Sequence, residues 1–124
     1  MALHNHVMIL ELRTYRLKPG SADEFVRVMT SQSMPLLARH GITVLDCGLS
    51  LDSDGEPQAD AYLIRAFESL AARDEQENAF YGSDAWINGP REAIVSRIES
   101  YHTIVLDLPA AAVRAFAAGS SRRA

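Results

Sequence analysis

Residues 7–18 form a run rich in aliphatic side chains that ends at Pro19-Gly20. A run of this length without glycine or proline, followed by a turn signal, predicts a β-strand. Strand side chains alternate between two faces, and here both faces are largely apolar. A sheet containing this strand therefore has to be covered on both sides, which limits the folds open to the chain.

One face of the predicted strand also carries three polar side chains in a row, those of Glu11, Arg13 and Tyr15. Alternate residues of a strand lie about 7 Å apart, so a carboxylate, a guanidinium and a phenol share one surface. This row is the best candidate for chemistry in the chain. The residue types alone leave the kind of chemistry open.

Length and charge exclude several classes of protein. A chain of 124 residues predicts one domain, and the hydrophobic (48%) and charged (23%) fractions are those of an ordinary globular protein. The net charge of −4, without a basic block, argues against nucleic-acid binding through phosphate contacts. No run approaches the roughly 20 apolar residues of a membrane span, so neither nucleic acid nor membrane is an expected partner.

Cysteine usage points to a reducing compartment. Cys47 is the only cysteine, so it cannot form an internal disulfide. Its neighbours carry no positive charge, which favours a buried, inert thiol. Residues 1–6 lack the features of a signal peptide and predict a loose lead-in whose His4 and His6 make a poor metal site. We expect a cytoplasmic protein without metal or cofactor.

Periodicity and turn signals divide the first half of the chain further. A helix is predicted from Ser21 to Gly41, with a capping box formed by Ser21 and Glu24 and an interruption at Pro35. Its inward positions are expected at Phe25, Val28, Met29, Gln32, Leu36 and Leu37. Residues 42–51 and 59–67 read as two strands joined by a polar turn.

The second half repeats the pattern of a helix followed by a strand. Ser69 caps a predicted helix over residues 70–81, with Arg73, Asp74, Glu75 and Glu77 on its solvent side. A turn containing Trp86 and a helix starting at Pro90 precede a strand over 99–108. Residues 110–118 predict a short helix anchored by Val113 and Phe116, and Gly119 begins a small basic tail.

The order β-α-β-β-α-β defines the expected architecture. It predicts an α+β, ferredoxin-like domain over residues 7–108, between a loose N-terminus (1–6) and a C-terminal helix and tail (109–124). Its sheet has four antiparallel strands with the main helices on one face. The other face also carries bulky apolar residues, and the simplest cover is a second copy of the chain. A homodimer whose two sheets enclose a shared interior is therefore expected.

Two stretches resemble a known family. Glu11-Leu12-Arg13-Thr14-Tyr15 precedes Leu17-Lys18-Pro19-Gly20, and residues 67–74 precede Ser83-Asp84-Ala85-Trp86. Over residues 7–108 this pattern resembles the NIPSNAP family, which implies a dimeric α+β barrel of the ferredoxin-like type. Ala66-Phe67 departs from the Trp-x-Tyr pattern commoner in the family, so a particular pocket is not implied. Roles of small NIPSNAP domains are largely unassigned, and relatives of the barrel include monooxygenases, isomerases, haem-degrading oxygenases and non-catalytic binders.

The first functional hypothesis is a site for a small organic molecule between sheet and helices. The protein would then be a small-molecule binder or, alternatively, a cofactor-free monooxygenase or isomerase. In the enzyme, Glu11 or His102 accepts a proton and Arg13 or Arg65 holds an enolate or carboxylate. The site candidates are Glu11, Arg13 and His102 for catalysis and Tyr15, Tyr62, Arg65 and Trp86 for ligand binding.

The second hypothesis is structural: Glu11, Arg13 and Arg65 form an ion-pair network within the sheet or across a dimer seam. A pocket holding an ordered ligand near Tyr15 and His102 would favour the first hypothesis, and a dry, packed seam the second. A haem site using His40 or His102 is a further alternative, although neither lies in a haem-specific motif. Whether the protein is catalytic stays open at this level.

Overall fold

The computed structural model describes the backbone of residues 6–123 and the side chains of residues 6–56 and 60–119. Its sheet contains four strands, β1 (Val7–Leu17), β2 (Thr43–Leu51), β3 (Pro57–Phe67) and β4 (Ile98–Pro109), in the order β2-β3-β1-β4. All neighbouring strands are antiparallel. This is the ferredoxin-like α+β arrangement expected from the order of elements, and the prediction of fold class is confirmed.

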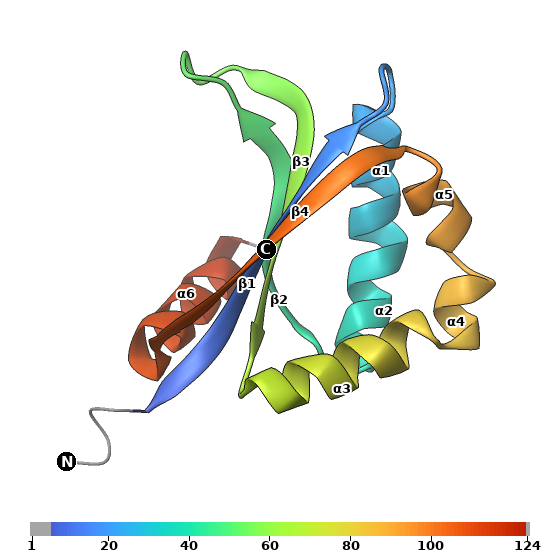
Figure 1. The fold of residues 1–124 in the computed structure, drawn as a ribbon. Coiled ribbons are helices and arrows are strands. Elements are labelled where there is room, and N and C mark those ends of the chain that lie inside the picture. Colours follow the sequence, from blue (N-terminus) through green and yellow to red (C-terminus); the bar gives the residue numbers. More distant parts are fainter. Residues whose placement is uncertain (1–5, 124) are drawn as a thin grey trace.

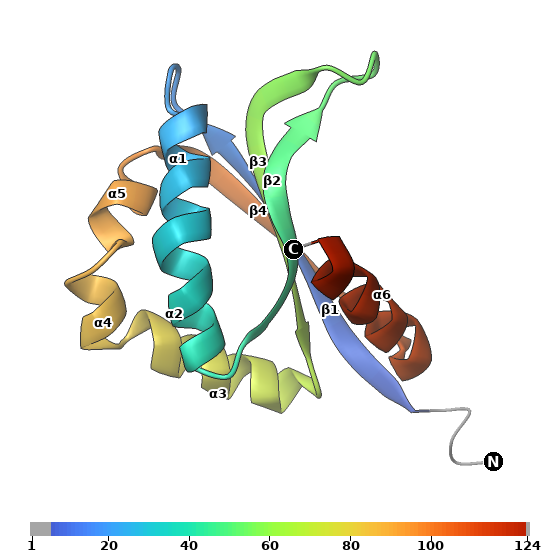
Figure 2. The ribbon, with the colours of Figure 1, turned by 180° about the vertical axis from the view of Figure 1, so that it is seen from behind.

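Helices lie on both sides of this sheet (Figure 1). One face is covered by α1 (Ala22–Val28), η2 (Met29–Ser33) and α2 (Met34–Arg39), which follow one another without a break, and by α3 (Leu70–Tyr81), α4 (Asp84–Ile87) and α5 (Arg91–Val95). The last helix, α6 (Ala110–Arg123), lies against the opposite face, as the view from behind also shows (Figure 2). No helix among the described residues is long and apolar enough to cross a membrane.

Two of the three serines expected to cap helix N-termini do so. Ser69 accepts a hydrogen bond from the amide of Ala72, and Ser83 accepts one from the amide of Trp86. The capping box predicted at Ser21 is wrong, because Ser21 has helical backbone angles and its side chain makes no capping bond. Glu24 instead accepts two hydrogen bonds from Arg27, each 2.6 Å long.

The expected interruption before Pro35 takes the form of a π-helix, η2. The amide of Met34 donates to the carbonyl of Met29, five residues back. Proline has no amide hydrogen to donate and clashes with an ordinary helical carbonyl, so the widened turn lets α2 restart with Pro35 in its first turn. Gly41 has a φ of 77°, a left-handed conformation that suits the C-terminal end of α2.

Two hydrophobic clusters form the core, one on each face of the sheet. The larger lies under α1 to α5 and includes Phe25, Leu37 and Phe80. The smaller lies under α6 and contains Met8, Leu45, Ala66, Ala110 and Val113. The chain therefore supplies part of the cover that we expected from a second copy.

The C-terminal helix differs from its predicted extent. It continues through Gly119, the expected start of the tail, to Arg123. Val113 is 2% exposed and anchors the helix, whereas Phe116 is 38% exposed and does not. Burial of one face of α6 against β1 and β2 explains why the alanine-rich segment stays helical beyond residue 118.

Candidate functional site

The register of the central strands places the polar row of β1 on the face that the helices cover. Glu11 lies directly opposite Arg65 of β3, and Arg13 lies opposite Thr103 of β4. Residues opposite one another in an antiparallel pair point to the same face. Glu11, Arg13 and Arg65 therefore come together beneath α3, far from one another in the sequence but adjacent in the sheet.

Glu11 and Arg65 form a fully buried ion pair, each side chain being 0% exposed. Arg65 donates to Glu11 Oε1 from Nε at 2.9 Å and also from Nη2, while Arg73 of α3 donates from Nε to Glu11 Oε2 at 2.7 Å. Both carboxylate oxygens thus accept charge-assisted hydrogen bonds. Glu11 therefore holds the sheet to α3, and both of its oxygens are engaged by arginines.

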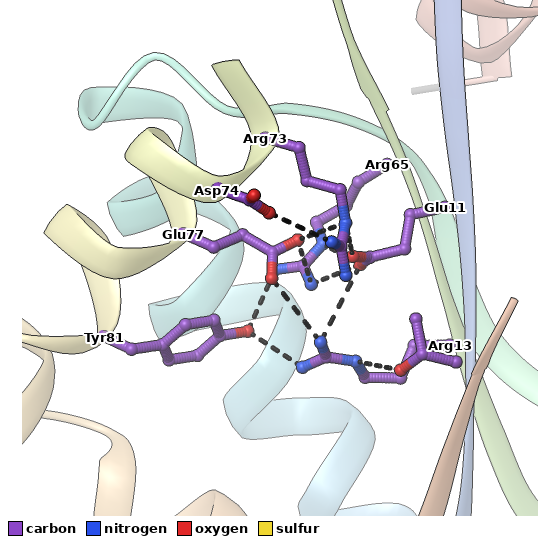
Figure 3. A network of polar contacts seen from close by, with 8 residues as sticks. Glu11, Arg13, Arg65, Arg73, Asp74, Glu77 and Tyr81 are labelled. Carbon is purple, nitrogen blue, oxygen red and sulfur yellow. Dashed lines mark hydrogen bonds and ion pairs between the residues drawn. The ribbon is translucent and has the colours of Figure 1, made fainter. Parts of the chain in front are cut away.

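Three further residues complete what we call the charged cluster: Glu11, Arg13, Arg65, Arg73, Glu77 and Tyr81 (Figure 3). Glu77 lies 3.2 Å from Arg65 Nη2 and 3.4 Å from Arg73 Nε. The Tyr81 hydroxyl accepts from Arg65 Nη1 at 2.9 Å and from Arg13 Nη1 at 3.3 Å. The arrangement joins β1, β3 and α3 through one continuous set of polar contacts.

The two carboxyl groups of the cluster have opposite pKa shifts. Burial raises the pKa of Glu77, and its hydrogen bond to Glu11 raises it further, to about 7. Burial alone would raise the pKa of Glu11 as well, but the hydrogen bond from Glu77 and the charge of Arg65 lower it to about 2. Near neutral pH, Glu77 can therefore exchange a proton while Glu11 stays ionised.

Arg13 keeps one guanidinium nitrogen, Nη2, without a hydrogen bond. Its Nε donates to Thr103 Oγ1 at 3.1 Å. Its Nη2 lies 3.7 Å from Glu77 Oε1 and 4.0 Å from Glu11 Oε1, which is longer than a hydrogen bond. Its side chain is 14% exposed, and its guanidinium carbon lies 5.1 Å from the centre of the Tyr101 ring.

A cavity of about 510 Å³ opens beside Arg13, between the sheet and the helices. Its polar lining includes Arg13, Glu77 and Tyr81, and its apolar and aromatic lining includes Tyr15, Met29, Leu37, Leu63, Phe80, Trp86, Ile94 and Tyr101. A mostly apolar cavity of this size with a few convergent polar groups is typical of sites for small molecules.

Ser33 lines the same cavity and is 1% exposed. Its hydroxyl is a buried side-chain oxygen with no hydrogen-bond partner among the described residues. A buried hydroxyl normally finds a partner because burying it unpaired costs about 1–3 kcal/mol. Ser33 ends the π-helix η2, and such widened turns occur frequently at functional sites.

Five of the seven candidate residues lie on the helix-covered face. Glu11, Arg13 and Arg65 belong to the charged cluster, and Tyr15 and Trp86 line the cavity. Burial raises the pKa of Tyr15, so its phenol stays protonated near neutral pH.

The placement of Tyr62 and His102 in this site is wrong. Both lie directly opposite Thr14, one on each side of β1, so the alternation of strand side chains sends them to the other face of the sheet. Tyr62 donates to Asp46 Oδ2 at 2.9 Å. His102 lines a second, smaller pocket of about 250 Å³ with Thr14, Arg16 and Asp60, and Tyr15 and Tyr101 line both this pocket and the main cavity.

The structure also bears on what was expected of His40, of Cys47 and of metal binding. His40 hydrogen-bonds the Leu36 carbonyl through Nδ1 at 3.0 Å and packs edge-on against Phe80, as expected of a helix-end residue. Burial and the charge of Asp46 raise the pKa of the Cys47 thiol to about 11, which fits an inert thiol. Across the described chain, no group of three His, Cys, Asp or Glu side chains could hold a metal ion.

Four residues of the site were not among the candidates from the sequence: Ser33, Arg73, Glu77 and Tyr81. The sequence pattern placed Arg73 and Glu77 on the solvent side of the 70–81 helix, and it predicted Gln32 as the inward residue where Ser33 is buried. Helical spacing carried a signal, because Arg73, Glu77 and the buried Phe80 follow one another at four and three residues. Likewise Ser33 lies four residues after the buried Met29 and four before the buried Leu37.

Both sequence hypotheses therefore describe part of the structure. Glu11 and Arg65 pair directly, as the structural hypothesis required. A cavity lies beside Tyr15, as the ligand hypothesis required, but His102 does not line it. The ion pairs and the cavity share one wall, formed by Arg13, Glu77 and Tyr81.

Comparisons with known proteins agree with this fold. The family model described as NIPSNAP matches residues 10–109. A crystal structure of a NIPSNAP family protein of unknown function from Agrobacterium tumefaciens is 25% identical, with a TM-score of 0.74 over 85% of this chain and 91% of that one. An uncharacterized NIPSNAP domain protein from Burkholderia xenovorans is 22% identical, with a TM-score of 0.66 over 83% and 95%. No curated protein matches the chain.

Proposed function

The chain belongs to the NIPSNAP family, and from its cavity we propose that it binds a small organic molecule between the sheet and the helices. The observation that carries this proposal is the cavity of about 510 Å³ with aromatic walls and a charged cluster at one side. Its volume lies within the roughly 300–1,000 Å³ usual for ligand sites. The buried hydroxyl of Ser33 supports the same function, because a ligand would supply the hydrogen-bond partner that the fold does not.

Trp86 makes the proposal testable with a neutral aromatic probe. It is the only tryptophan and it lines the cavity, so its indole N–H gives one unmistakable NMR signal. Titration with 2-naphthamide is expected to shift this signal saturably with a stoichiometry of one per chain.

A matched pair of variants locates the binding. Val95→Phe adds bulk at the lining of the cavity, whereas Ile87→Phe adds the same ring at an exposed position of the neighbouring helix α4. Weaker binding is expected only for Val95→Phe. No saturable shift, or equal effects of the two substitutions, would contradict a site in this cavity.

An enzymatic function is the second candidate, and the pKa of about 7 at Glu77 favours it. A carboxylate with this pKa at a cavity wall can accept a proton from carbon and return it. In an isomerase, Glu77 would take a proton from the carbon beside a substrate carbonyl, and Arg13 would hold the enolate oxygen. The same enolate-forming step could begin a cofactor-free monooxygenation with dioxygen as co-substrate.

Proton exchange tests this candidate without knowledge of the natural substrate. With 2-tetralone in deuterated water, the protein is expected to accelerate exchange of the hydrogens beside the carbonyl above the buffer rate. Glu77→Gln should remove the acceleration, and Glu75→Gln, an exposed change on the same helix, should retain it. Equal exchange rates with and without protein would exclude this enzymatic function, and small-molecule binding would be the only function proposed.

We further propose that two copies associate through the sheet face that α6 leaves open. Ile104 and Leu106 of β4 lie on that face, opposite Leu12 and Leu10, and each is 41% exposed. Exposed apolar side chains grouped on one face are a common feature of association surfaces. A cytoplasmic location is also proposed, on the basis of the single cysteine.

A further inference from the structure

We propose that the ligand is an organic anion, with an apolar or aromatic body, one acidic group held by Arg13 and a second polar atom held by Ser33. The inference rests on the proposed binding function and specifies the chemistry of the ligand. Three independent features of the cavity carry it: the charge of its wall, the unused hydrogen-bonding capacity of Arg13, and the unpartnered hydroxyl of Ser33.

The charge balance at the wall favours an anion. Within the charged cluster, Arg13, Arg65 and Arg73 face only two carboxyl groups, those of Glu11 and Glu77. Asp74 also approaches Arg73, at 3.3 Å, but from an exposed position where water screens its charge. Arg91 also lines the cavity, but it is exposed too, so water screens its charge in the same way. A carboxylate in the cavity would therefore meet a net positive wall.

Among the three arginines of the charged cluster, Arg13 is the one that both lines the cavity and keeps a guanidinium nitrogen without a hydrogen bond, so it is the contact for this anion. Arg65 uses Nε, Nη1 and Nη2 on Glu11, Tyr81 and Glu77 and is inaccessible to solvent. Arg13 lines the cavity, and its Nη2 reaches the nearest carboxylate oxygen only at 3.7 Å. A guanidinium binds carboxylates through parallel N–H donors, and Nη2 is available for one of them.

Tyr81 and Tyr101 lie beside Arg13 and add to its contact with the proposed anion. Tyr81 accepts hydrogen bonds from both Arg13 and Arg65, so its own O–H can donate to an oxygen bound beside Arg13. The ring of Tyr101 lies over the Arg13 guanidinium and is itself 62% exposed. These two side chains combine a polar end for the acidic group with aromatic surface for the body of the ligand.

Ser33 provides the second contact from the helical side of the cavity. Its buried hydroxyl can donate to a carbonyl or accept from a hydroxyl. Ser33→Ala should therefore raise the thermal stability of the free protein slightly, because it removes a buried polar group without a partner. It should also weaken binding of 6-hydroxy-2-naphthoate, whose hydroxyl is a second polar group, more than binding of 2-naphthoate. Ser31→Ala, at an exposed position two residues earlier, is the matched control.

The charge requirement is tested with 2-naphthoate against 2-naphthamide, which have nearly the same shape and differ in charge. The Trp86 indole signal measures both dissociation constants. Because a hydrogen bond to a charged group contributes more than a neutral one, naphthoate is expected to bind about tenfold more tightly. Arg13→Gln should abolish this preference, and Arg16→Gln, on the other face of the same strand, should retain it.

The outcomes separate this inference from the proposed function. If neither naphthoate nor naphthamide binds, the proposed binding function itself is wrong. If naphthamide binds and naphthoate binds no better, or if the preference survives unchanged in Arg13→Gln, the anion inference is overturned. Arg13→Lys keeps the charge but loses the planar fork, and a reduced but remaining preference in that variant supports Arg13 as the contact even where Arg13→Gln does not fold.

Discussion

At the scale of single residues, the pairing of Glu11 with Arg65 accounts for most of the polar character of the core. Both side chains are inaccessible to solvent, and each remains charged because the other lies within hydrogen-bond distance. A buried pair of this kind contributes little net stability relative to apolar side chains, but removing one partner leaves the other charge unpaired. The cluster is therefore sensitive to single substitutions.

Glu11→Gln is expected to lower the free energy of unfolding by about 3 kcal/mol, because Arg65 and Arg73 lose their shared carboxylate. Urea denaturation followed by circular dichroism measures the change. The control is Glu24→Gln, which breaks the solvent-exposed pair with Arg27 and should shift the denaturation midpoint far less. Equal shifts in the two variants would mean that the buried pair has no special structural role.

The opposite pKa shifts of Glu77 and Glu11 predict a stability maximum in mildly acidic solution. The folded pKa of Glu77 is raised from 4.5 to about 7, so folding favours its protonated form, and its contribution is lost as pH rises from about 4.5 to about 7. The folded pKa of Glu11 is lowered to about 2, so its contribution is lost as pH falls below about 4.5. Each loss amounts to at most about 3 kcal/mol.

Denaturation midpoints measured from pH 3 to pH 8 would reveal these slopes. Glu77→Gln should remove the decline between about pH 4.5 and 7, while Glu75→Gln, exposed on the same helix, should preserve it. A wild-type profile that is flat over this interval would show that Glu77 titrates at its ordinary value.

At the scale of secondary-structure elements, two helices depart from simple amphipathic patterns. The π-helix η2 brings Ser33 to the cavity wall, and α6 covers part of the far face of the sheet with a sequence rich in alanine. Alanine has the highest helix propensity but buries little apolar area. The docking of α6 therefore depends on its few larger side chains.

Val113 is expected to dominate the docking of α6. Val113→Ala should lower the free energy of unfolding by about 1–2 kcal/mol, because it removes two buried methyl groups and leaves a small cavity. Phe116→Ala removes a larger side chain but from a position that is 38% exposed, and it should cost less. Chemical denaturation of both variants decides between them, and a greater loss for Phe116→Ala would contradict the described packing.

At the scale of the whole molecule, the sheet separates two different environments. The helix-covered face holds the charged cluster and the cavity, and the other face is shared between α6 and an open apolar area on β1 and β4. The proposed ligand site and the proposed dimer surface therefore lie on opposite sides of the sheet. Substitutions at one are expected to leave the other intact.

Light scattering coupled to size-exclusion chromatography tests the dimer directly. The wild-type chain is expected to elute at twice its monomer mass. Ile104→Lys should convert it to a monomer, because the lysine would place a charge in the open apolar area. The adjacent Val105→Lys changes a similarly exposed residue that points to the helix side and should stay dimeric. A wild-type monomer would refute the proposal.

Much of the fold could be predicted from local sequence signals. The strand at residues 7–17, the capping of Ser69 and Ser83, and the restart before Pro35 all depend on residues close to one another in the chain. The capping box was wrong at Ser21, whose backbone is already helical, and Glu24 pairs with Arg27 one turn away instead. The inward direction of Arg73 and Glu77 was missed because charged residues on a helix are usually solvated.

The sequence by itself determined the order of the strands and helices, and with it the ferredoxin-like sheet. It also determined that Glu11, Arg13 and Tyr15 share one face of a strand. Both follow from side-chain alternation and turn chemistry, which are local properties of the chain. Only the tertiary structure decided which long-range partners those side chains meet. Strand register set Arg65 beside Glu11 on the helix-covered face, and alternation along β3 and β4 then left Tyr62 and His102 on the far face. The docking of α3 then supplied Arg73, Glu77 and Tyr81, since burial and pairing depend on residues that only folding brings together.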